Sequence, residues 1–370
     1  MLHAFPDLLR TVIAFVVVLG VLVFIHELGH YLAARWRGVH VEAFSIGFGR
    51  SIFEWKDRVG TKWRVAWLPL GGYVKLHGQE RPEDVTPEVR ASWLRGRTFH
   101  EKSLASRAII VAAGPIANFI LAMVLFGFLF AAIGRPIVLP VVGEVLPDSA
   151  AAKAGLVAND RIEAIGGEPT KTFEDIQRII SSHPEVRLAM TVLRGNETRQ
   201  LSVLTQSVES HGRKIGLLGI RGGQTEYRPV SLPVALWGGV QQTWTITADT
   251  FSGLAQMIAG ERGTDELGGP LRIAQLSGQV AELGIASLIS FIAVLSVNLG
   301  LINLFPIPVL DGGHLLFYAA EAVRGRPLPA RAQEYGFRAG IAVLAGLFLF
   351  ATWNDLANIG LFRWVAGLIG

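Results

Sequence analysis

The chain has 370 residues, of which 51% are hydrophobic and 17% charged, and it contains no cysteine. A soluble protein of this length usually carries about 25% charged residues, so the composition argues against a soluble globular protein. The missing cysteines exclude disulfides and thiolate zinc sites, and the net charge of +4 gives no indication of nucleic-acid binding.

The hydrophobic residues are concentrated in blocks, as they are in membrane proteins. Stretches without Asp, Glu, Lys or Arg cover Thr11–Ile25, Ala108–Gly134 and Leu283–Leu310, and a shorter one covers Ala339–Trp353. A helix needs about 20 residues to cross a bilayer core, so the first span must extend beyond Ile25. The charged, bulky segment after it argues against a cleaved signal peptide. We therefore predict a polytopic α-helical membrane protein with about four transmembrane helices.

Basic residues are distributed unevenly between the segments that join the spans. Three of them, Arg324, Arg326 and Arg331, precede the fourth span. Thirteen more lie between the first two spans: Arg35, Arg37, Arg50, Lys56, Arg58, Lys62, Arg64, Lys75, Arg81, Arg90, Arg95, Arg97 and Lys102. The positive-inside rule assigns both segments to the cytoplasm. We therefore expect both termini to face outward, on the side opposite the cytoplasm, together with the segment from Arg135 to about Glu282.

The uncharged stretch Val230–Ala248 is an alternative fifth span. Its Pro233, Gly238 and Gly239 are poorly suited to a spanning helix and better suited to an interfacial one. We therefore expect amphipathic or linker helices on the outer leaflet over residues 227–282.

The first span contains His26, Glu27 and His30 in the pattern H-E-x-x-H. Residues four apart share one face of a helix, so both imidazoles can point at one ion with Glu27 beside them. Neutral imidazole suits Zn²⁺, and a catalytic zinc takes three protein ligands and a water. An ionisable group inside a span costs about 3 kcal/mol, which disfavours the alternative of two packed histidines and a surface-seeking glutamate.

The candidate third ligand is Asp311, which follows the third span. Pro306 and Pro308 break that apolar run, and membranes tolerate such a break where backbone lines a cavity or packs on protein. We expect Gly312 and Gly313 to let the backbone turn sharply. The alternative for Asp311 is a helix-capping aspartate at the membrane surface. With four spans, the first and third run in the same direction, so the histidines and Asp311 share the cytoplasmic half; a fifth span would separate them.

These motifs resemble those of the bacterial site-2 metalloprotease family. The resemblance rests on His26-Glu27-x-x-His30 and on Asn303-x-x-Pro306-x-Pro308-x-Leu310-Asp311-Gly312-Gly313. Further similar elements are Gly114-Pro115-x-x-Asn118-Phe119, Phe44-Ser45-Ile46-Gly47-Phe48-Gly49 and Gly71-Gly72-Tyr73-Val74-Lys75.

The resemblance implies that zinc is bound by His26, His30 and Asp311, with Glu27 as general base. It also implies that Asn303 holds the scissile carbonyl or its oxyanion, a role that suits an uncharged amide donor. In the family, the loop with Gly71, Gly72 and Tyr73 is a short β element that dips into the membrane and binds extended substrate. From the residues alone, 63–70 is a strand ending at Pro69, with Gly71 and Gly72 as a turn; an ordinary cytoplasmic hairpin is the alternative.

The segment 137–222 changes to short β-like runs separated by turns. We expect strands at Val141–Leu146, Arg161–Ile165, Val186–Leu193 and Gln200–Leu204, and a helix at Thr172–Ser181. Pro147-Asp148-Ser149-Ala150, Ala154-Gly155-Leu156 and Asn159-Asp160-Arg161-Ile162 resemble a bacterial PDZ domain, in which Gly usually stands where Asn159 does. A PDZ fold binds peptide termini by adding a strand to its sheet. The length holds one such domain.

The resulting prediction is an intramembrane zinc metalloendopeptidase for regulated intramembrane proteolysis. Its expected substrates are single-span membrane proteins, such as a pre-trimmed anti-sigma factor or remnant signal peptides. A catalytically inactive PDZ-bearing membrane scaffold is the alternative, and a zinc transporter is disfavoured because the second and fourth spans offer almost no ionisable residues. The remaining histidines, His314 among them, lack ligand spacing and are expected at the surface or in packing.

The expected boundaries follow from these assignments. Transmembrane helices cover 1–36, 104–134, 283–310 and 335–356. Cytoplasmic loops cover 37–103, with the membrane-associated β element, and 311–334, with Asp-Gly-Gly. The PDZ-like α+β domain covers 137–222, the amphipathic or linker segment 227–282, and the C-terminal tail 357–370.

Overall fold

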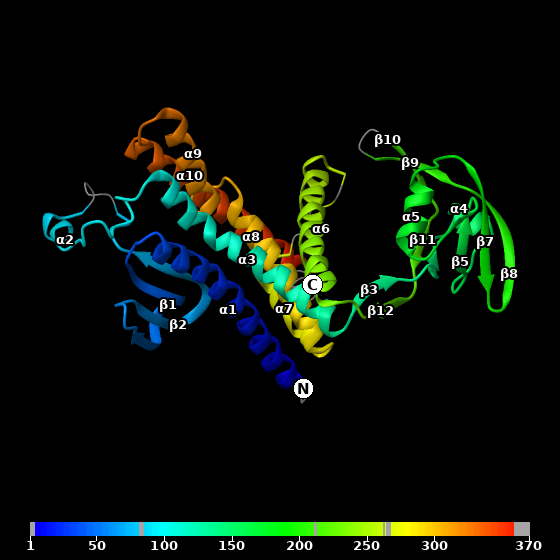
Figure 1. Ribbon diagram of the computed structural model, residues 1–370, viewed down its shortest axis with the longest axis horizontal. Coiled ribbons are helices and arrows are strands. Elements are labelled where there is room, and N and C mark those ends of the chain that lie inside the picture. Colours follow the sequence, from blue (N-terminus) through cyan, green and yellow to red (C-terminus); the bar gives the residue numbers. More distant parts are fainter. Residues whose placement is uncertain (1–3, 81–84, 211–212, 262, 264–267, 359–370) are drawn as a thin grey trace, which may run out of the picture. The chain divides into compact units, whose positions relative to one another are not determined.

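The computed structural model describes residues 4–358 except 81–84, 211–212, 262 and 264–267 (Figure 1). The chain divides into two compact units. The first comprises Met1–Leu129 and Leu236–Gly370, and the second comprises Phe130–Ala235.

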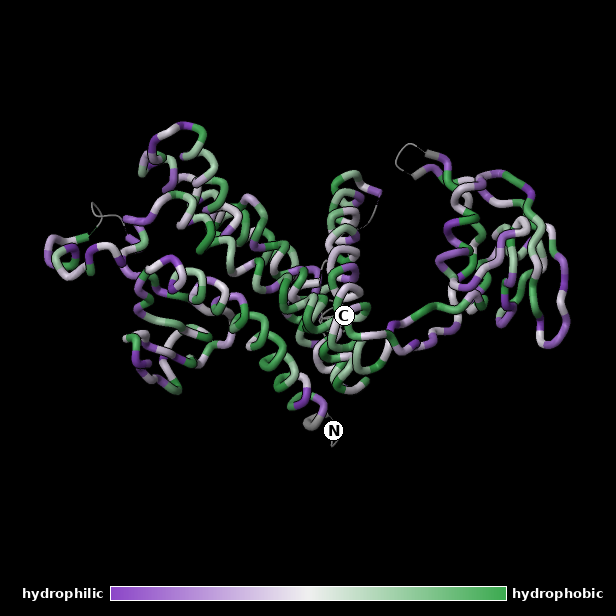
Figure 2. The backbone as a smooth tube through the Cα atoms, in the orientation of Figure 1, coloured by the Kyte–Doolittle hydropathy of each residue, from purple (hydrophilic) through white to green (hydrophobic). Residues whose placement is uncertain are grey.

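Four helices of the described chain are long and apolar enough to cross a membrane. They are α1 (Ala4–Trp36), α3 (Leu104–Ala132), α8 (Ile285–Leu304) and α10 (Ala330–Asn358). Hydrophobic residues run along each of them (Figure 2). Four is the number of spans expected from the sequence. Helices α1 and α10 contain their expected apolar stretches, whereas α3 ends at Ala132 and α8 covers only the central part of the third stretch.

Small residues let the first three of these helices pack closely. A Cβ at Gly29 of α1 would lie 2.3 Å from the carbonyl oxygen of Ala113 in α3, so only glycine allows this approach. Between α3 and α8, the Ser296 hydroxyl donates a hydrogen bond of 2.8 Å to the carbonyl oxygen of Asn118. Backbone contact of this kind is typical of helix packing in membranes, where small residues bring helices together.

Two long strands, β1 (Val41–Lys56) and β2 (Lys62–Leu76), form the sheet of the first unit. Phe44 pairs with both Val74 and Trp63, and Trp63 also pairs with Trp55. Both strands are therefore bent, and their halves lie side by side. The prediction of a strand ending at Pro69 with a glycine turn was wrong, because β2 continues through Gly71 and Gly72 to Leu76. Gly71 has a φ of +142° and marks a change of direction within the strand.

Two further helices precede α8 in the described chain, α6 (Leu232–Ile258) and α7 (Pro270–Glu282). A Cβ at Gly239 of α6 would lie 2.3 Å from the carbonyl oxygen of Met123, so α6 packs tightly on α3. The α6 helix is not among the four candidate spans. The carboxylate of Asp355 on α10 accepts hydrogen bonds from backbone N–H groups at the start of α7, those of Gly269, Leu271 and Arg272, over 2.8–3.1 Å. It thereby satisfies donors that a helix start leaves unpaired.

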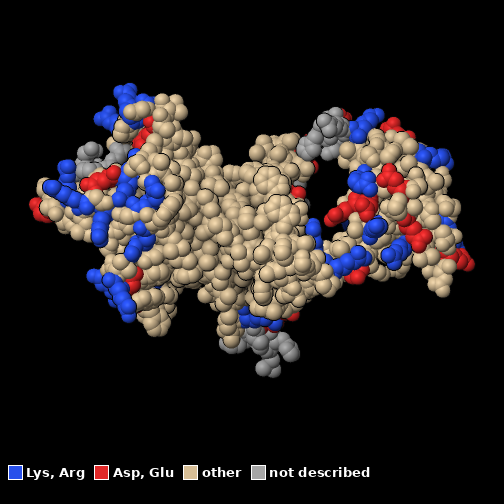
Figure 3. All heavy atoms as spheres, viewed as in Figure 1, with Lys and Arg blue, Asp and Glu red and all other residues tan. Residues whose placement is uncertain are grey.

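The remaining helices among the described residues of the first unit are α2 (Pro87–Ala91) and α9 (Asp311–Arg324). The segment 311–334, expected as a loop, thus begins with a helix. On the face shown in Figure 3, Lys and Arg of this unit gather at the end that carries β1, β2, α2 and α9, and few charged residues lie over the long helices.

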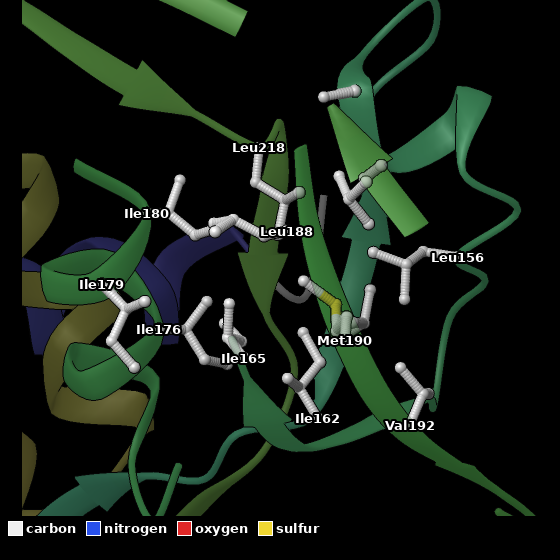
Figure 4. Close-up of a cluster of buried hydrophobic side chains, with 14 of the residues drawn as sticks. Leu156, Ile162, Ile165, Ile176, Ile179, Ile180, Leu188, Met190, Val192 and Leu218 are labelled. Atoms are coloured by element: carbon white, nitrogen blue, oxygen red, sulfur yellow. The ribbon is translucent and has the colours of Figure 1, made fainter. Parts of the chain in front are cut away.

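The second unit is a β-rich domain built around one hydrophobic core. Its elements are β3 (Arg135–Val138), β4 (Val142–Val145), α4 (Ala150–Lys153), β5 (Arg161–Ile165), β6 (Glu168–Pro169), α5 (Phe173–Ser181), β7 (Arg187–Arg194), β8 (Glu197–Leu204), β9 (Gln206–Ser210), β10 (Arg213–Leu217), β11 (Ile220–Gly222) and β12 (Thr225–Arg228). The main sheet has the order β6-β5-β7-β8, and the other strands form the pairs β11-β4, β10-β9 and β12-β3. Ile162, Ile165, Ile176, Met190 and Val192 lie at the centre of the core (Figure 4).

The four strands and the helix expected in this unit are present. A buried carboxylate organises the turn before β5: Asp160 accepts hydrogen bonds from Val157 N (2.9 Å) and from Arg194 Nε (2.7 Å) and Nη2 (2.8 Å). Its neighbour Asn159 has a φ of +69°. This left-handed conformation suits glycine best and asparagine next, which explains the departure noted in the sequence.

Candidate metal centre

Helix α1 supplies three of the predicted site residues. His26 and His30 lie one turn apart, and their ring centroids are 4.8 Å from each other. Between them, Glu27 is buried, with 9% of its surface exposed. The interior of this apolar helix therefore carries three ionisable side chains on neighbouring positions.

The fourth predicted residue, Asp311, is the first residue of α9. The chain reaches it through Val309, whose φ of +99° is a strained conformation for a β-branched residue. Gly312 and Gly313 do not form the sharp turn that we expected, because both are helical and neither has a positive φ. They are required for close packing instead, since a Cβ on either would lie 2.3 Å from a carbonyl oxygen of the Pro-broken segment before α9.

Three potential ligand atoms from these helices converge. Asp311 Oδ2 lies 3.2 Å from His26 Nε2 and 3.4 Å from His30 Nε2. The two Nε2 atoms are 3.2 Å apart. Helices α1 and α9 are far apart in the sequence, but the packing of α1, α3 and α8 places them next to each other. The structure therefore brings together all three predicted ligands.

This geometry fits a zinc ion. Ligands about 2.0–2.1 Å from a tetrahedral zinc lie about 3.3 Å from one another, close to the three separations observed. Asp311 Oδ2 is buried and has no hydrogen-bond partner among the described residues. A buried carboxylate oxygen without a donor is unfavourable, and a cation between it and the two imidazoles would satisfy it.

The outer ring nitrogens of both histidines have partners on α3. His30 Nδ1 lies 2.9 Å from the carbonyl oxygen of Ile110, and this contact fixes the proton on Nδ1 and leaves Nε2 free to bind a metal. His26 Nδ1 faces the side-chain amide of Asn118 at 3.2 Å. Asn118 Oδ1 is buried, and no described residue donates a hydrogen bond to it. With the amide turned over, Oδ1 would accept the Nδ1–H of a metal-binding His26.

The β2 strand contacts Glu27 through Gly72. A Cβ at this position would lie 2.9 Å from Glu27 Cγ and 2.6 Å from the carbonyl oxygen of Ser45. Only glycine therefore allows β2 to pass between β1 and the glutamate. The predicted β element and the predicted general base are adjacent in the structure.

A cavity of about 840 Å³ contains the cluster. Glu27, Gly72, Tyr73 and Asn303 all line it, so most of the remaining predicted site residues face one space. The Asn303 side chain donates a hydrogen bond of 3.0 Å to the carbonyl oxygen of Leu299 one turn earlier. Gly71, by contrast, is not among the lining residues and contacts Phe48.

Sequence reasoning missed several residues of this site. His314, expected at the surface or in packing, packs against Phe337 with ring centroids 5.3 Å apart, and it also lines the cavity. The Ile110 carbonyl leaves no signal in a sequence, because every residue has one. The polar Asn118 inside an apolar span is a signal that could have identified a partner of the histidines.

Comparisons with known proteins agree with this geometry. The model of peptidase family M50 matches residues 14–347. A protein of Rhizobium meliloti named as a zinc metalloprotease is 45% identical over 371 residues, covering 95% of this chain and 97% of the relative. Metalloprotease MmpA of Caulobacter vibrioides is 38% identical, and the alignment covers 95% of this chain and 96% of that protein. The regulator of sigma-E protease RseP of Escherichia coli is 33% identical over 453 residues, and the alignment covers 94% of this chain and 98% of that protein.

The last alignment is longer than this chain, so RseP contains additional residues within the region compared. Among solved structures, the PDZ domain of the SdrC-like protein from Listeria monocytogenes is 23% identical. It has a TM-score of 0.20 and covers 22% of this chain and 82% of that domain. The assignment of the second unit as a PDZ domain stays a proposal.

Proposed function

The chain belongs to peptidase family M50 and is a zinc metalloprotease, and from this premise we propose that it hydrolyses peptide bonds within the membrane. The observation that carries the proposal is the convergence of His26, His30 and Asp311 beside helices apolar enough to span a bilayer. Ionisable groups inside a span are costly and usually functional. A cluster in this position is therefore suited to a peptide bond that also lies in the membrane.

We assign His26, His30 and Asp311 as the zinc ligands and Glu27 as the general base. When bound, zinc polarises the scissile carbonyl and lowers the pKa of a water toward about 7. Glu27, the next residue after His26, takes the proton of that water and returns it to the leaving nitrogen. Its burial removes competing solvent and keeps its carboxylate directed into the cavity.

Asn303 is proposed to hold the carbonyl oxygen as it gains negative charge. Its amide carries two N–H donors, and the hydrogen bond to Leu299 uses one of them and fixes the side-chain orientation. The second donor remains available to the cavity. A donor fixed before the reaction is more effective than a flexible one, because no reorganisation is needed when charge develops.

The substrate is proposed to bind as a strand along β2. Gly72 and Tyr73 pair with β1 on one side and line the cavity as well. An extended peptide added there would place its backbone beside Glu27. Gly71 contributes by bending β2 into this position. Helical spans must unwind to be cut, and pairing with β2 would compensate the backbone hydrogen bonds that unwinding breaks.

The proposed substrates are the transmembrane segments of single-span membrane proteins, such as a pre-trimmed anti-sigma factor or a remnant signal peptide. This makes the reaction a step of regulated intramembrane proteolysis. A catalytically inactive PDZ-bearing scaffold is the alternative; the buried Glu27 and the three converging ligands support the protease.

We propose that the protein is a multi-pass protein of the bacterial inner membrane. The concentration of Lys and Arg around β1, β2, α2 and α9 (Figure 3) supports a cytoplasmic location of this end, with both termini periplasmic and the active site toward the cytoplasmic side. The second unit would then be periplasmic. As a PDZ-like domain it would bind peptide termini and act either as a size filter or as a tether for substrates.

The proposal is tested by reconstituting the zinc-loaded full chain with a model single-span protein in liposomes. Mass spectrometry of the fragments should locate the cut inside the apolar segment of the substrate, and the Glu27→Gln variant should give no fragments. Cuts confined to the soluble flanks of the substrate would contradict intramembrane proteolysis.

A further inference from the structure

The cavity that contains the metal cluster extends to Arg107, Tyr318 and Glu321, none of which has a role in the proposed reaction. Arg107 belongs to α3 and precedes Ile110 and Gly114 by three and seven positions, so the three share one face of that helix. Ile110 and Gly114 both contact His30. At 1.5 Å per residue, Arg107 lies about 10 Å along α3 from the point of contact at Gly114.

The Arg107 guanidinium is only partly engaged. Its carbon lies 5.1 Å from the ring centroid of Tyr318, so the side chain is held on the aromatic face. Its contact with Glu321 is long, 3.5 Å from Nη2 to Oε2. Arg107 Nε is buried and has no acceptor among the described residues. A guanidinium has five N–H donors, and within the described chain the hydrogen bond to Glu321 uses one of those of Arg107.

Glu321 cannot supply the missing acceptor without giving up other bonds. Its Oε1 accepts from the backbone N–H of Leu328 at 3.2 Å and from Gln333 Nε2 at 3.4 Å. These contacts tie the carboxylate to the segment after α9 and leave it buried. Next to it, burial raises the pKa of Tyr318 to about 12, although Arg107 opposes this, so the phenol stays protonated and is a further donor.

Peptide-bond hydrolysis creates an anion that matches these donors. The oxygen of water bonds to the carbonyl carbon, the C–N bond breaks, and the nitrogen takes a proton. One product therefore ends in a new carboxylate, formed beside the metal cluster. The guanidinium of Arg107, in the same cavity, can bind this carboxylate through two parallel hydrogen bonds.

We propose that Arg107 and Tyr318 form a binding site for the new C-terminal carboxylate of the product, which moves there from the metal cluster before release. The inference rests on the proposed function of the cluster. Along the axis of α3, the backbone of Arg107 lies about 10 Å from that of Gly114, which is about the length of three residues of extended chain. We expect a product carboxylate held by Arg107 to have left the reacting position.

The test measures binding of two labelled apolar octapeptides, identical except that one ends in a free carboxylate and the other in an amide. Fluorescence anisotropy is recorded with the zinc-loaded Glu27→Gln full chain in detergent, which separates binding from turnover. The acid should bind about tenfold more tightly than the amide, as expected of a charge-assisted hydrogen bond. Adding Arg107→Gln should reduce the ratio to about one, whereas Arg326→Gln, which removes an exposed arginine, should leave it unchanged.

An acid preference that persists with Arg107→Gln and disappears on removal of zinc would mean that the carboxylate binds the metal, and it would overturn the proposal. Equal binding of both peptides to the Glu27→Gln chain would overturn it too.

If Arg107→Gln does not purify as a monodisperse protein, Arg107→Lys replaces it. Lysine keeps the charge without the planar fork, so the ratio should fall at least about threefold, and an unchanged ratio rejects the site. Loss of cleavage by the otherwise intact chain, with the binding ratio preserved, would reject the proposed function and not this site.

Discussion

Gly114 of α3 lies directly against the imidazole of His30: a Cβ built on this glycine would be 2.2 Å from Nε2, the ring nitrogen that faces Asp311. Helix α3 thus fixes the position of His30 from two sides, with the Ile110 carbonyl at Nδ1 and a bare backbone at Nε2. The metal cluster depends on a residue that carries no side chain.

The substitution Gly114→Ala should therefore lower zinc affinity. The added methyl group cannot be accommodated unless the ring of His30 or helix α3 moves, and displaced partners of ligands typically weaken metal binding about 10- to 100-fold. Zinc content of the purified chain, measured after dialysis against a weak chelator, reports the effect. Gly20→Ala on α1 is the matched control, because a Cβ there meets no atom of the described residues within 4 Å. Full zinc retention by Gly114→Ala would show that His30 is not held in this way.

The contact between Gly72 and Glu27 predicts a different outcome for Gly72→Ala. Zinc should stay bound, since the three atoms nearest to the new Cβ belong to Ser45, Val23 and Glu27 and not to a proposed zinc ligand. The rate of cleavage should fall between about 10- and 100-fold, because a small displacement of a reacting group is enough for such a loss. Parallel measurements of zinc content and kcat separate the two effects. A loss of zinc equal to the loss of rate would contradict the assigned role of Gly72.

The ion pair of Asp160 and Arg194 predicts how the second unit responds to acid. Burial alone would raise the pKa of Asp160, but the hydrogen bonds from Arg194 and Val157 and the charge of Arg194 outweigh it and hold the pKa below the usual range. A lowered folded-state pKa stabilises the fold above about pH 3.9, and this contribution is lost as the pH falls through the folded-state value. Asp160→Asn should accordingly increase hydrogen exchange of β5 and β7 at pH 7. At a pH below the folded-state pKa of Asp160, hydrogen exchange of the variant should approach that of the wild-type chain. A difference in exchange between the two chains that grew on acidification would contradict this account.

Removal of the second unit distinguishes a size filter from a tether. The pairing of Val138 with Thr225 between β3 and β12 allows residues 139–224 to be replaced by a short glycine turn. If the unit is a filter, the variant should cut both full-length and pre-trimmed substrates, because the residues of the metal centre lie outside the deletion. We expect this result. Loss of cleavage of the pre-trimmed substrate by a stably inserted, zinc-loaded variant would instead identify a tether.

The sequence predicted those features that arise from local periodicity. The spacing of His26 and His30 on one helix needs no tertiary information, and the uncharged stretches define four apolar helices. Asp311 could be connected to the histidines only by combining its position after a broken span with a resemblance to known motifs. Its approach through a strained Val309 has no sequence signature.

The features that the sequence did not predict depend on tertiary packing. The sequence pattern of Pro69, Gly71 and Gly72 favours a strand end and a turn, because glycine pairs usually reverse the chain. In the structure they let a strand bend and pass beside Glu27. Gly312 and Gly313 likewise serve close contact and not a turn. Arg107 and His314 give no pattern in the sequence, and only the folded cavity relates them to the cluster.

The central claim is that the cluster holds zinc and that Glu27 acts on the water. It is tested most directly by measuring zinc content and substrate cleavage on the same preparation of Glu27→Gln. The glutamine is nearly isosteric and cannot accept a proton, so the variant should hold as much zinc as the wild-type chain and lose at least about 100-fold in cleavage rate. A fully zinc-loaded variant that cleaves within about tenfold of the wild-type rate would contradict the account.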